Sequence, residues 1–227
     1  MTPELPETPN KYCPQCEKLT RFCFCPSIKR VLNSVSVIIL QHPQEPKEPL
    51  STARLTNLAL TQCTLVRALS RPNLRVAAKG LPKAESLTFD PKKWLVLYLG
   101  SKSESGKAPS GPGLVLVNKK STPLDKAETA LILKGIEGIV ALDGTWSQSK
   151  ALWWRNPWLL KLQRAYLVPK RPSAYGKQRK EPRPECLSTI ESIAETLTFL
   201  NEPPEVEANL REVFDRLLAG FKKSQPA

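Results

Sequence analysis

The sequence predicts an α/β protein built on a mostly parallel β-sheet with helices on both faces. Three observations lead to this prediction: the apolar runs are continuous instead of alternating, helical patterns lie between several of them, and 227 residues are enough for a sizeable core. Hydrophobic residues make up 41% of the chain and charged residues 24%, as in ordinary folded proteins. Ligands of such sheets bind beyond the carboxyl ends of the strands, so a site is expected there.

Six short apolar runs are predicted to form strands, at 34–42, 74–78, 94–99, 114–117, 139–142 and 165–168. Five segments with apolar residues at helical spacing are predicted to form helices, at 51–69, 126–133, 147–162, 188–200 and 205–221. Ser51 or Thr52 is expected to cap the first helix, and Ser188 with Glu191 has the pattern of a capping box. The polar stretch 100–113 is expected to be a flexible loop.

The N-terminal residues do not have the pattern of a targeting segment. The start, MTPELPETPNKY, is acidic and rich in proline, unlike a signal peptide. No run approaches the ~18 consecutive apolar residues of a membrane helix. We therefore expect a cytoplasmic protein with no membrane partner, in which disulfide bonds would be rare.

Four cysteines lie close together, as Cys13-x-x-Cys16 and Cys23-x-Cys25. Four thiolates in so short a segment can close a tetrahedral shell around Zn²⁺. We predict a structural zinc site in an N-terminal segment of residues 1–30, followed by one domain of residues 31–227. A redox pair and unligated thiols are the alternatives.

The charge distribution favours a polyanionic partner. The chain has 34 Lys+Arg against 21 Asp+Glu, a net charge of +13. Residues 147–184 contain ten basic residues and one acidic residue. Aromatic residues, which stack on unpaired bases in many RNA-binding proteins, are interleaved with them: Trp153, Trp154, Trp158, Tyr166 and Tyr175. RNA or single-stranded DNA is the predicted partner, and a solvated helix face over core aromatic residues is the alternative.

Several common chemistries do not fit the residues present. Five residues separate Gly100 from Gly106, and Ala108 stands where a phosphate-binding loop needs a hydroxyl group. No G-x-G-x-x-G pattern occurs, so a dinucleotide site is not expected. His42 is the one histidine of the chain, which excludes mechanisms that need two.

The segment GIVALDGTWSQSKALWW (138–154) is the strongest candidate for a catalytic site. A buried strand ends at Asp143, Gly144 permits a sharp turn, and hydroxyl-bearing residues begin a helix. An α/β protein places catalytic groups at such a strand end. The alternative is that Asp143 or Ser147 caps the helix and Trp146 belongs to the core.

Four ordered blocks together resemble the DTW-domain proteins, a family of tRNA-uridine aminocarboxypropyltransferases. They are the four-cysteine cluster, QHPQEPKEPLSTARL (41–55), LDGTWSQSK with Asp143, Thr145 and Trp146, and CLSTIES (186–192). The resemblance spans nearly the whole chain. The long polar loop at 100–113 is the main departure.

The resemblance implies a SPOUT-like domain with a knotted cofactor site, which transfers the 3-amino-3-carboxypropyl group of S-adenosylmethionine to N3 of a uridine in tRNA. The products would be acp3U and 5′-methylthioadenosine. Asp143 would accept or orient the N3 proton. The residues expected to bind the cofactor are Leu142, Thr145, Trp146, Leu187, Ser188 and Thr189, although Ser188 and Thr189 also fit a purely structural cap. The residues expected to contact tRNA are His42, Thr52, Arg54, Lys150, Arg155, Lys170, Arg171, Lys177, Arg179 and Lys180.

Two other functions remain open. A SPOUT-like RNA methyltransferase would use the same cofactor but present its methyl carbon, leaving S-adenosylhomocysteine. A non-catalytic, zinc-bearing RNA-binding module would explain the charge and the cysteines, but not the blocks around Asp143 and Ser188.

Overall fold

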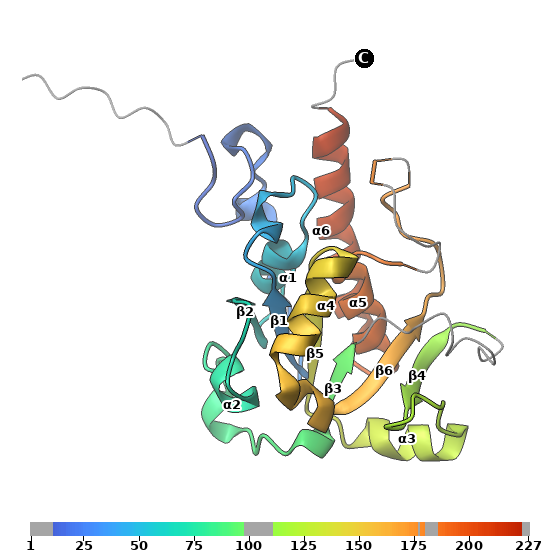
Figure 1. Ribbon diagram of the computed structural model, residues 1–227. Helices are drawn as coiled ribbons and strands as arrows, with labels where there is room; N and C mark the ends of the chain where they lie inside the picture. Colours follow the sequence, from blue (N-terminus) through green and yellow to red (C-terminus); the bar gives the residue numbers. More distant parts are fainter. Residues whose placement is uncertain (1–10, 98–110, 177, 180–185, 224–227) are drawn as a thin grey trace, which may run out of the picture.

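The computed structural model describes residues 11–97, 111–176, 178–179 and 186–223 and contains one six-stranded sheet of order β2-β1-β5-β3-β6-β4 (Figure 1). The strands are β1 (Ser36–Gln41), β2 (Cys63–Arg67), β3 (Trp94–Leu97), β4 (Gly113–Val117), β5 (Gly138–Asp143) and β6 (Gln163–Val168). Neighbouring strands pair in parallel, except that β4 is antiparallel to β6. The predicted α/β class with a mostly parallel sheet is confirmed.

Helices cover both faces of the sheet. They are α1 (Ala53–Ala59), α2 (Leu74–Ala77), α3 (Lys126–Lys134), α4 (Trp146–Arg155), α5 (Thr189–Phe199) and α6 (Pro204–Lys222). Alternate residues of β1 point to opposite faces, so Val37 and Ile39 pack in one core with α1, α5 and α6. Ile38 and Leu40 pack in the other core with α2 and α4. In Figure 1, α4 crosses the face nearer the viewer.

Two sequence predictions were wrong. The segment 51–69 is not one helix: α1 ends at Ala59 and β2 follows, pairing in parallel with β1. The run at 74–78, predicted to be a strand, is the short helix α2, whose N-cap Asn73 accepts a hydrogen bond from the Val76 N–H. A short apolar run does not distinguish a buried helix from a buried strand.

The other elements lie close to their predicted positions. The helix predicted at 147–162 ends at Arg155, because Pro157 follows and starts a 3₁₀ turn, Pro157–Lys161. Most of the loop predicted at 100–113, residues 100–110, lies outside the described residues. The SPOUT-like knot and the division at residue 30 stay predictions. Within the described ranges, no helix combines the length and apolarity needed to span a membrane.

Gly138, at the start of β5, allows a close approach of Trp94. Trp94 is fully buried, and a Cβ at Gly138 would lie 2.5–2.7 Å from three atoms of its ring. We expect Gly138→Ala to lower the free energy of unfolding by about 1–3 kcal/mol, because the core must shift to admit the methyl group. Gly113→Ala is the matched control, since a Cβ there meets nothing within 4 Å. Urea denaturation with equal midpoints for both variants would contradict this account of the packing.

Candidate active site

Asp143 is held at the carboxyl edge of the sheet by two neighbouring elements. It is the last residue of β5 and lies opposite Gln41, the last residue of β1. Gln41 Nε2 donates a hydrogen bond to Asp143 Oδ2 at 2.8 Å, and Thr189 Oγ1 donates to Oδ1 at 2.5 Å. Only 3% of Asp143 is exposed. Both carboxylate oxygens are therefore fixed in direction, inside the protein.

The environment of Asp143 favours its uptake of a proton. Burial raises the pKa of the Asp143 carboxyl above its ordinary value, because a charged carboxylate loses hydration there. The hydrogen bonds from Thr189 and Gln41, and the positive charges of Arg179 and Lys18, oppose this rise without cancelling it. A raised pKa makes a carboxylate a better proton acceptor near neutral pH.

The turn after Asp143 shows that this residue is not a helix cap. Thr145 is the N-cap of α4: its side chain accepts from the Gln148 N–H, and Gln148 Oε1 accepts from the Thr145 N–H at 2.7 Å. The structure therefore contradicts the alternative in which Asp143 or Ser147 caps the helix. Gly144 has a φ of 157°, and a Cβ there would lie 2.8 Å from the Gln148 side chain.

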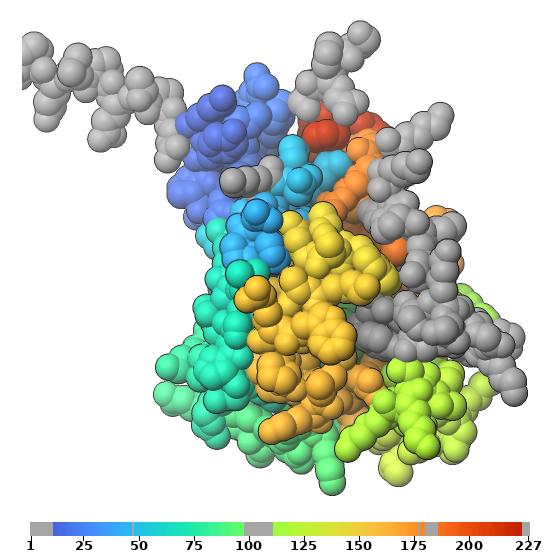
Figure 2. All heavy atoms as spheres, in the orientation of Figure 1, coloured from blue at the N-terminus to red at the C-terminus, as the bar shows by residue number. Residues whose placement is uncertain are grey.

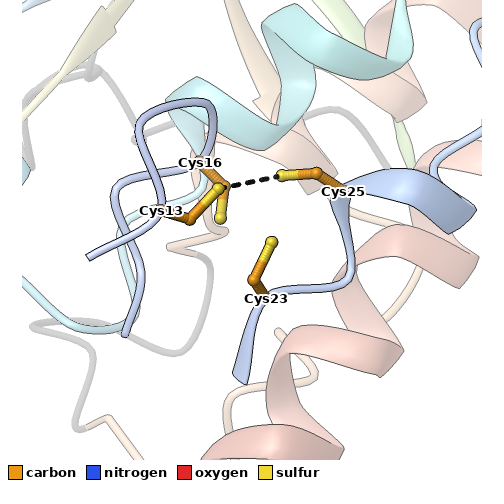
Figure 3. A group of neighbouring side chains, drawn as sticks. All are labelled: Cys13, Cys16, Cys23 and Cys25. Carbon is orange, nitrogen blue, oxygen red and sulfur yellow. Dashed lines mark hydrogen bonds between the residues drawn. The ribbon is translucent and has the colours of Figure 1, made fainter. Parts of the chain in front are cut away.

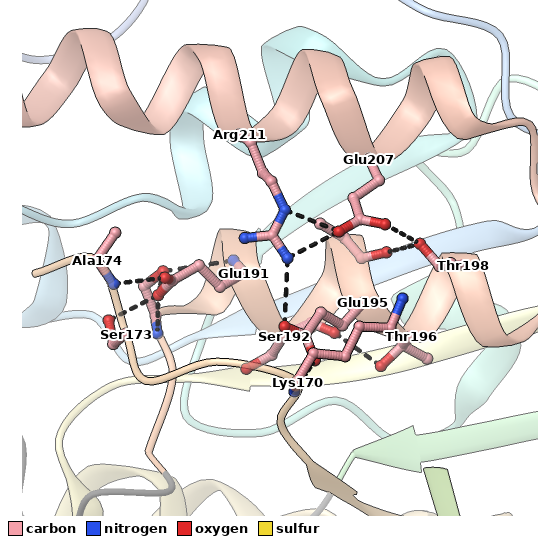
Figure 4. A network of polar contacts seen from close by, with 12 residues as sticks. Lys170, Ser173, Ala174, Glu191, Ser192, Glu195, Thr196, Thr198, Glu207 and Arg211 are labelled. Carbon is pink, nitrogen blue, oxygen red and sulfur yellow. Dashed lines mark hydrogen bonds and ion pairs between the residues drawn. The ribbon is translucent and has the colours of Figure 1, made fainter. Parts of the chain in front are cut away.

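The capping box at the start of α5 also binds the segment 173–174. Ser188 and Glu191 form the predicted capping box. Glu191 also accepts hydrogen bonds from Ser173 Oγ at 2.7 Å and from the Ala174 N–H at 2.8 Å (Figure 4). Glu191, the N3 residue of this capping box, thus fastens the segment that precedes Tyr175 and Arg179 against the helix.

A polar cavity of about 60 Å³ lies beside Asp143. Its walls come from the loop after β1, the end of β5, the segment around Tyr175 and the start of α5. It is lined by Glu45, Ser51, Thr52, Asp143, Gly144, Tyr175, Arg179, Leu187, Ser188 and Thr189. The structure therefore brings together six of the residues predicted from the sequence: Thr52, Asp143, Arg179, Leu187, Ser188 and Thr189.

The other predicted residues lie outside this cavity. Leu142, Thr145 and Trp146 belong to the adjoining strand end and helix start. His42 joins the edge through its backbone N–H, which donates to the Asp143 carbonyl at 2.9 Å, while its ring accepts from the Gln44 N–H. Arg54 faces the cysteine segment, where its Nε donates to the Gln15 carbonyl.

The predicted tRNA contacts divide into surface and buried groups. Lys150, Arg155, Lys170 and Arg171 are exposed, and Lys177 and Lys180 lie outside the described residues. Arg179 lies 3.7 Å from Glu45 and over the ring of Tyr175, so it is a cavity residue. Trp158 and Tyr175, predicted to stack on bases, are instead buried at 6% and 2% exposure, as the core alternative requires.

Glu45 and Gln41 are site residues that the sequence did not identify, whereas Ser51, Gly144 and Tyr175, which also line the cavity, were predicted in other roles. Glu45 starts the 3₁₀ turn Glu45–Lys47 and is only 2% exposed. Burial and the nearby Asp143 charge raise the pKa of Glu45 to about 7. Gln41 carried a signal, because it is a polar residue at the end of an apolar run. Nothing in the sequence separates Glu45 from the exposed Glu48 of the same loop.

The four cysteines of the N-terminal segment converge on one point (Figure 3). Their sulfur atoms all lie within 4.8 Å of one another, and Cys13 Sγ is 3.9 Å from Cys25 Sγ. A tetrahedral zinc with Zn–S bonds of ~2.3 Å separates its sulfurs by ~3.8 Å, so the cluster has the size of a metal shell. Backbone hydrogen bonding lowers the pKa of Cys13 to about 7, whereas burial raises the pKa of Cys16.

A chain of side-chain contacts links the cysteine segment to Asp143. Glu17, next to Cys16, forms a bidentate ion pair with Arg67 of β2. Arg67 Nε donates to Gln41 Oε1 at 2.7 Å, which leaves Gln41 Nε2 directed at Asp143. The orientation of the Gln41 amide is therefore set from the cysteine segment.

Comparison with known proteins adds an independent finding. A family model described as DTW domain matches residues 10–222. A Drosophila melanogaster protein named tRNA-uridine aminocarboxypropyltransferase 2 is 31% identical over 209 residues, which cover 90% of this chain and 72% of that protein. Proteins of the same name from Macaca fascicularis and Mus musculus are 27% and 25% identical, over 91% and 84% of this chain. The matched region spans 63% of the macaque protein and 56% of the mouse protein, and no solved structure matches significantly.

Proposed function

Because this chain belongs to the DTW-domain family, we propose that it is a tRNA-modifying transferase that moves the 3-amino-3-carboxypropyl group of S-adenosylmethionine to N3 of a uridine. The observation that carries the proposal is the buried Asp143, which lines a small polar cavity together with Arg179 and the start of α5. The names of the three relatives support aminocarboxypropyl transfer to a uridine of tRNA, and the donor and the N3 position belong to our proposal.

The reaction makes one bond and breaks one bond. Uridine N3 attacks the carbon of the amino-acid arm that is bonded to sulfur, the carbon–sulfur bond breaks, and its electrons remain with sulfur in 5′-methylthioadenosine. The N3 proton leaves to a base, for which we propose Asp143. The sulfonium has three electrophilic carbons, so the pocket must hold the arm in line with N3 and turn the methyl group away.

The cavity has the dimensions for the end of that arm and not for the nucleoside. A volume of about 60 Å³ holds an amino-acid head group. Arg179 and the positive end of the α5 dipole would face its carboxylate, because the Ser188 and Thr189 hydroxyl groups already donate to Glu191 and Asp143. The adenosine would lie beyond the cavity, against Leu142, Thr145, Trp146 and Leu187. Zn²⁺ at the cysteines would stabilise the N-terminal segment and take no part in the chemistry, because four cysteine ligands complete its shell.

We place the tRNA on the exposed face of α4, which crosses the middle of the surface seen in Figure 2. Lys150, Trp154 and Arg155 are exposed on this helix, and Trp154 shows 75% of its surface. Cations that meet phosphates and an aromatic ring that stacks on a base are the usual elements of such a surface. The exposed Lys170 and Arg171 follow β6, and the Lys170 ammonium lies over the ring of Phe199 in α5, which packs on the other face of the sheet from α4.

We expect replacement of Lys150 and Arg155 by glutamine to weaken tRNA binding and to flatten its salt dependence. Each phosphate contact removed should lower the slope of log affinity against log salt by about one unit. Lys134→Gln on α3 is the control, since it removes an exposed cation from another helix. A slope unchanged by the α4 substitutions, measured by fluorescence anisotropy, would move the tRNA surface elsewhere.

The by-product of the reaction tests the proposed function. Wild-type protein incubated with S-adenosylmethionine and unmodified tRNA should release 5′-methylthioadenosine, which chromatography separates from S-adenosylhomocysteine. Release of S-adenosylhomocysteine would indicate methyl transfer instead. Failure to bind S-adenosylmethionine in calorimetry would favour a non-catalytic RNA-binding module.

A further inference from the structure

Glu45 carries a buried carboxylate oxygen with no partner. Its Oε1 lies 3.7 Å from Arg179 Nη1, whereas Oε2 is buried and accepts no hydrogen bond within the described part of the chain. A buried acceptor without a donor is unfavourable, and native proteins rarely retain one without a reason. Because Glu45 lines the cavity beside Asp143, a bound ligand can supply the missing donor.

The backbone after β1 fixes Glu45 in this position. The Glu45 N–H donates to the His42 carbonyl at 3.0 Å, and the Glu48 N–H donates to the Glu45 carbonyl at 2.9 Å. Lys18 Nζ donates to the Pro49 carbonyl at 2.8 Å and holds the end of the same turn. The carboxylate is therefore part of a formed site and not a loop side chain free to turn outward.

Among the described carboxylates that line the cavity, Glu45 has the one oxygen, Oε2, that accepts no hydrogen bond. Both oxygens of Asp143 already accept hydrogen bonds, from Gln41 and from Thr189. A cation with N–H donors satisfies Glu45 Oε2 and offsets two neighbouring carboxylates, whereas an apolar group does neither. Arg179, on the other side of Glu45, and the start of α5 suit an anion. The cavity thus offers one place for a positive group and one for a negative group close together. The ammonium and carboxylate groups of an α-amino acid have this arrangement.

We propose that Glu45 binds the ammonium group of the amino-acid arm of S-adenosylmethionine, while Arg179 and the start of α5 bind its carboxylate. This inference rests on the proposed function, because it names the part of the donor that the cavity recognises. The arm is the group to be transferred. Binding of its ammonium and carboxylate groups would fix the carbon next to sulfur at the mouth of the cavity. The pair would then be a specificity determinant for arm transfer over methyl transfer.

Calorimetry with three ligands tests the assignment. The ligands are S-adenosylmethionine, its analogue without the amino group, and 5′-methylthioadenosine, which lacks the whole arm. Glu45→Gln should weaken binding of S-adenosylmethionine by about 10- to 100-fold, the usual cost of a lost charged hydrogen bond. Binding of 5′-methylthioadenosine should change by less than about twofold, and binding of the deamino analogue should not weaken, since neither carries an ammonium group. Glu48→Gln is the matched control, because Glu48 is exposed in the same loop.

The pH dependence of binding is a second measurement. The pKa of Glu45 is raised to about 7 by burial and by Asp143, against the opposing effects of Arg179 and Lys18, and Glu48 adds a small rise. The carboxyl is therefore largely protonated at pH 6 and cannot pair with an ammonium group. Affinity for S-adenosylmethionine should fall between pH 7.5 and pH 6 in wild type, while affinity for the deamino analogue should not fall through this pH range.

The outcomes separate this inference from the proposed function. Equal weakening of all three ligands by Glu45→Gln, or unchanged binding of S-adenosylmethionine, would overturn the ammonium assignment alone. Unchanged binding with a large loss of single-turnover rate would instead make Glu45 a proton acceptor. A wild-type protein that binds none of the three ligands would overturn the proposed function, and the inference with it.

Discussion

Replacing Asp143 with asparagine should slow single-turnover transfer by about 10²- to 10⁴-fold, the usual loss when a general base is removed. This corresponds to about 3–5 kcal/mol of transition-state stabilisation. The amide cannot take up the N3 proton. Its oxygen can still accept from Gln41 Nε2, and its N–H can donate to Thr189 Oγ1, so both native contacts have replacements. The fold and the binding of tRNA should therefore change little.

The control for this variant is Asp125→Asn. Asp125 caps α3, where its side chain accepts from the Glu128 N–H, and asparagine is about as good a cap as aspartate. Rates are compared at saturating S-adenosylmethionine and tRNA, after equal melting temperatures are established. Because Thr145 caps α4, loss of a helix cap cannot explain a slower Asp143→Asn variant. A loss of less than about tenfold would show that another group removes the proton.

Loss of the metal should disorder the N-terminal segment and then slow catalysis. Freshly purified protein should contain about one Zn²⁺ per chain, and Cys16→Ser should remove it, since a closed tetrahedral shell needs all four thiolates. Structural zinc contributes about 10–16 kcal/mol to the folding of isolated zinc-finger peptides. Hydrogen exchange should therefore become faster throughout residues 11–27 when the metal is lost. Cys63→Ser is the control, because Cys63 is buried in β2 outside the cluster.

The contacts from Glu17 through Arg67 and Gln41 to Asp143 predict how disorder of the cysteine segment would change the active site. Without an ordered Glu17, Arg67 loses its ion pair, and the Gln41 amide is no longer held toward Asp143. We expect Cys16→Ser to lower the rate more than it lowers affinity for S-adenosylmethionine. Substoichiometric metal in unchelated wild-type protein, measured by elemental analysis, would overturn the zinc prediction itself.

The sequence predicted the elements whose local pattern and tertiary environment agree. β1 and β5 are continuous apolar runs at the centre of the sheet, and the capping box at Ser188 is a local pattern. β2 was missed because the apolar residues of 63–67 continue the helical spacing of α1, and only pairing with β1 makes them a strand. In that segment tertiary contacts override the local preference.

The sequence identified those residues of the candidate site that have a local signal, and missed those whose role depends on tertiary contacts. Asp143 stands out because a carboxylate ends an apolar strand, and Ser188 stands out because it begins a helix pattern. The role of Glu45 depends on distant residues, since Arg179 and Asp143 surround it only after folding. Likewise, Trp158 and Tyr175 could not be separated from the exposed Trp154 by sequence, because burial decides between them.

Mass spectrometry of nucleosides tests the central claim most directly. Unmodified tRNA is incubated with wild-type protein and S-adenosylmethionine, digested to nucleosides, and compared with a reaction of the Asp143→Asn variant. We expect a uridine that has gained the aminocarboxypropyl group, formed in equal amount to 5′-methylthioadenosine and strongly reduced in the variant. A uridine that has gained only a methyl group, together with S-adenosylhomocysteine, would contradict it.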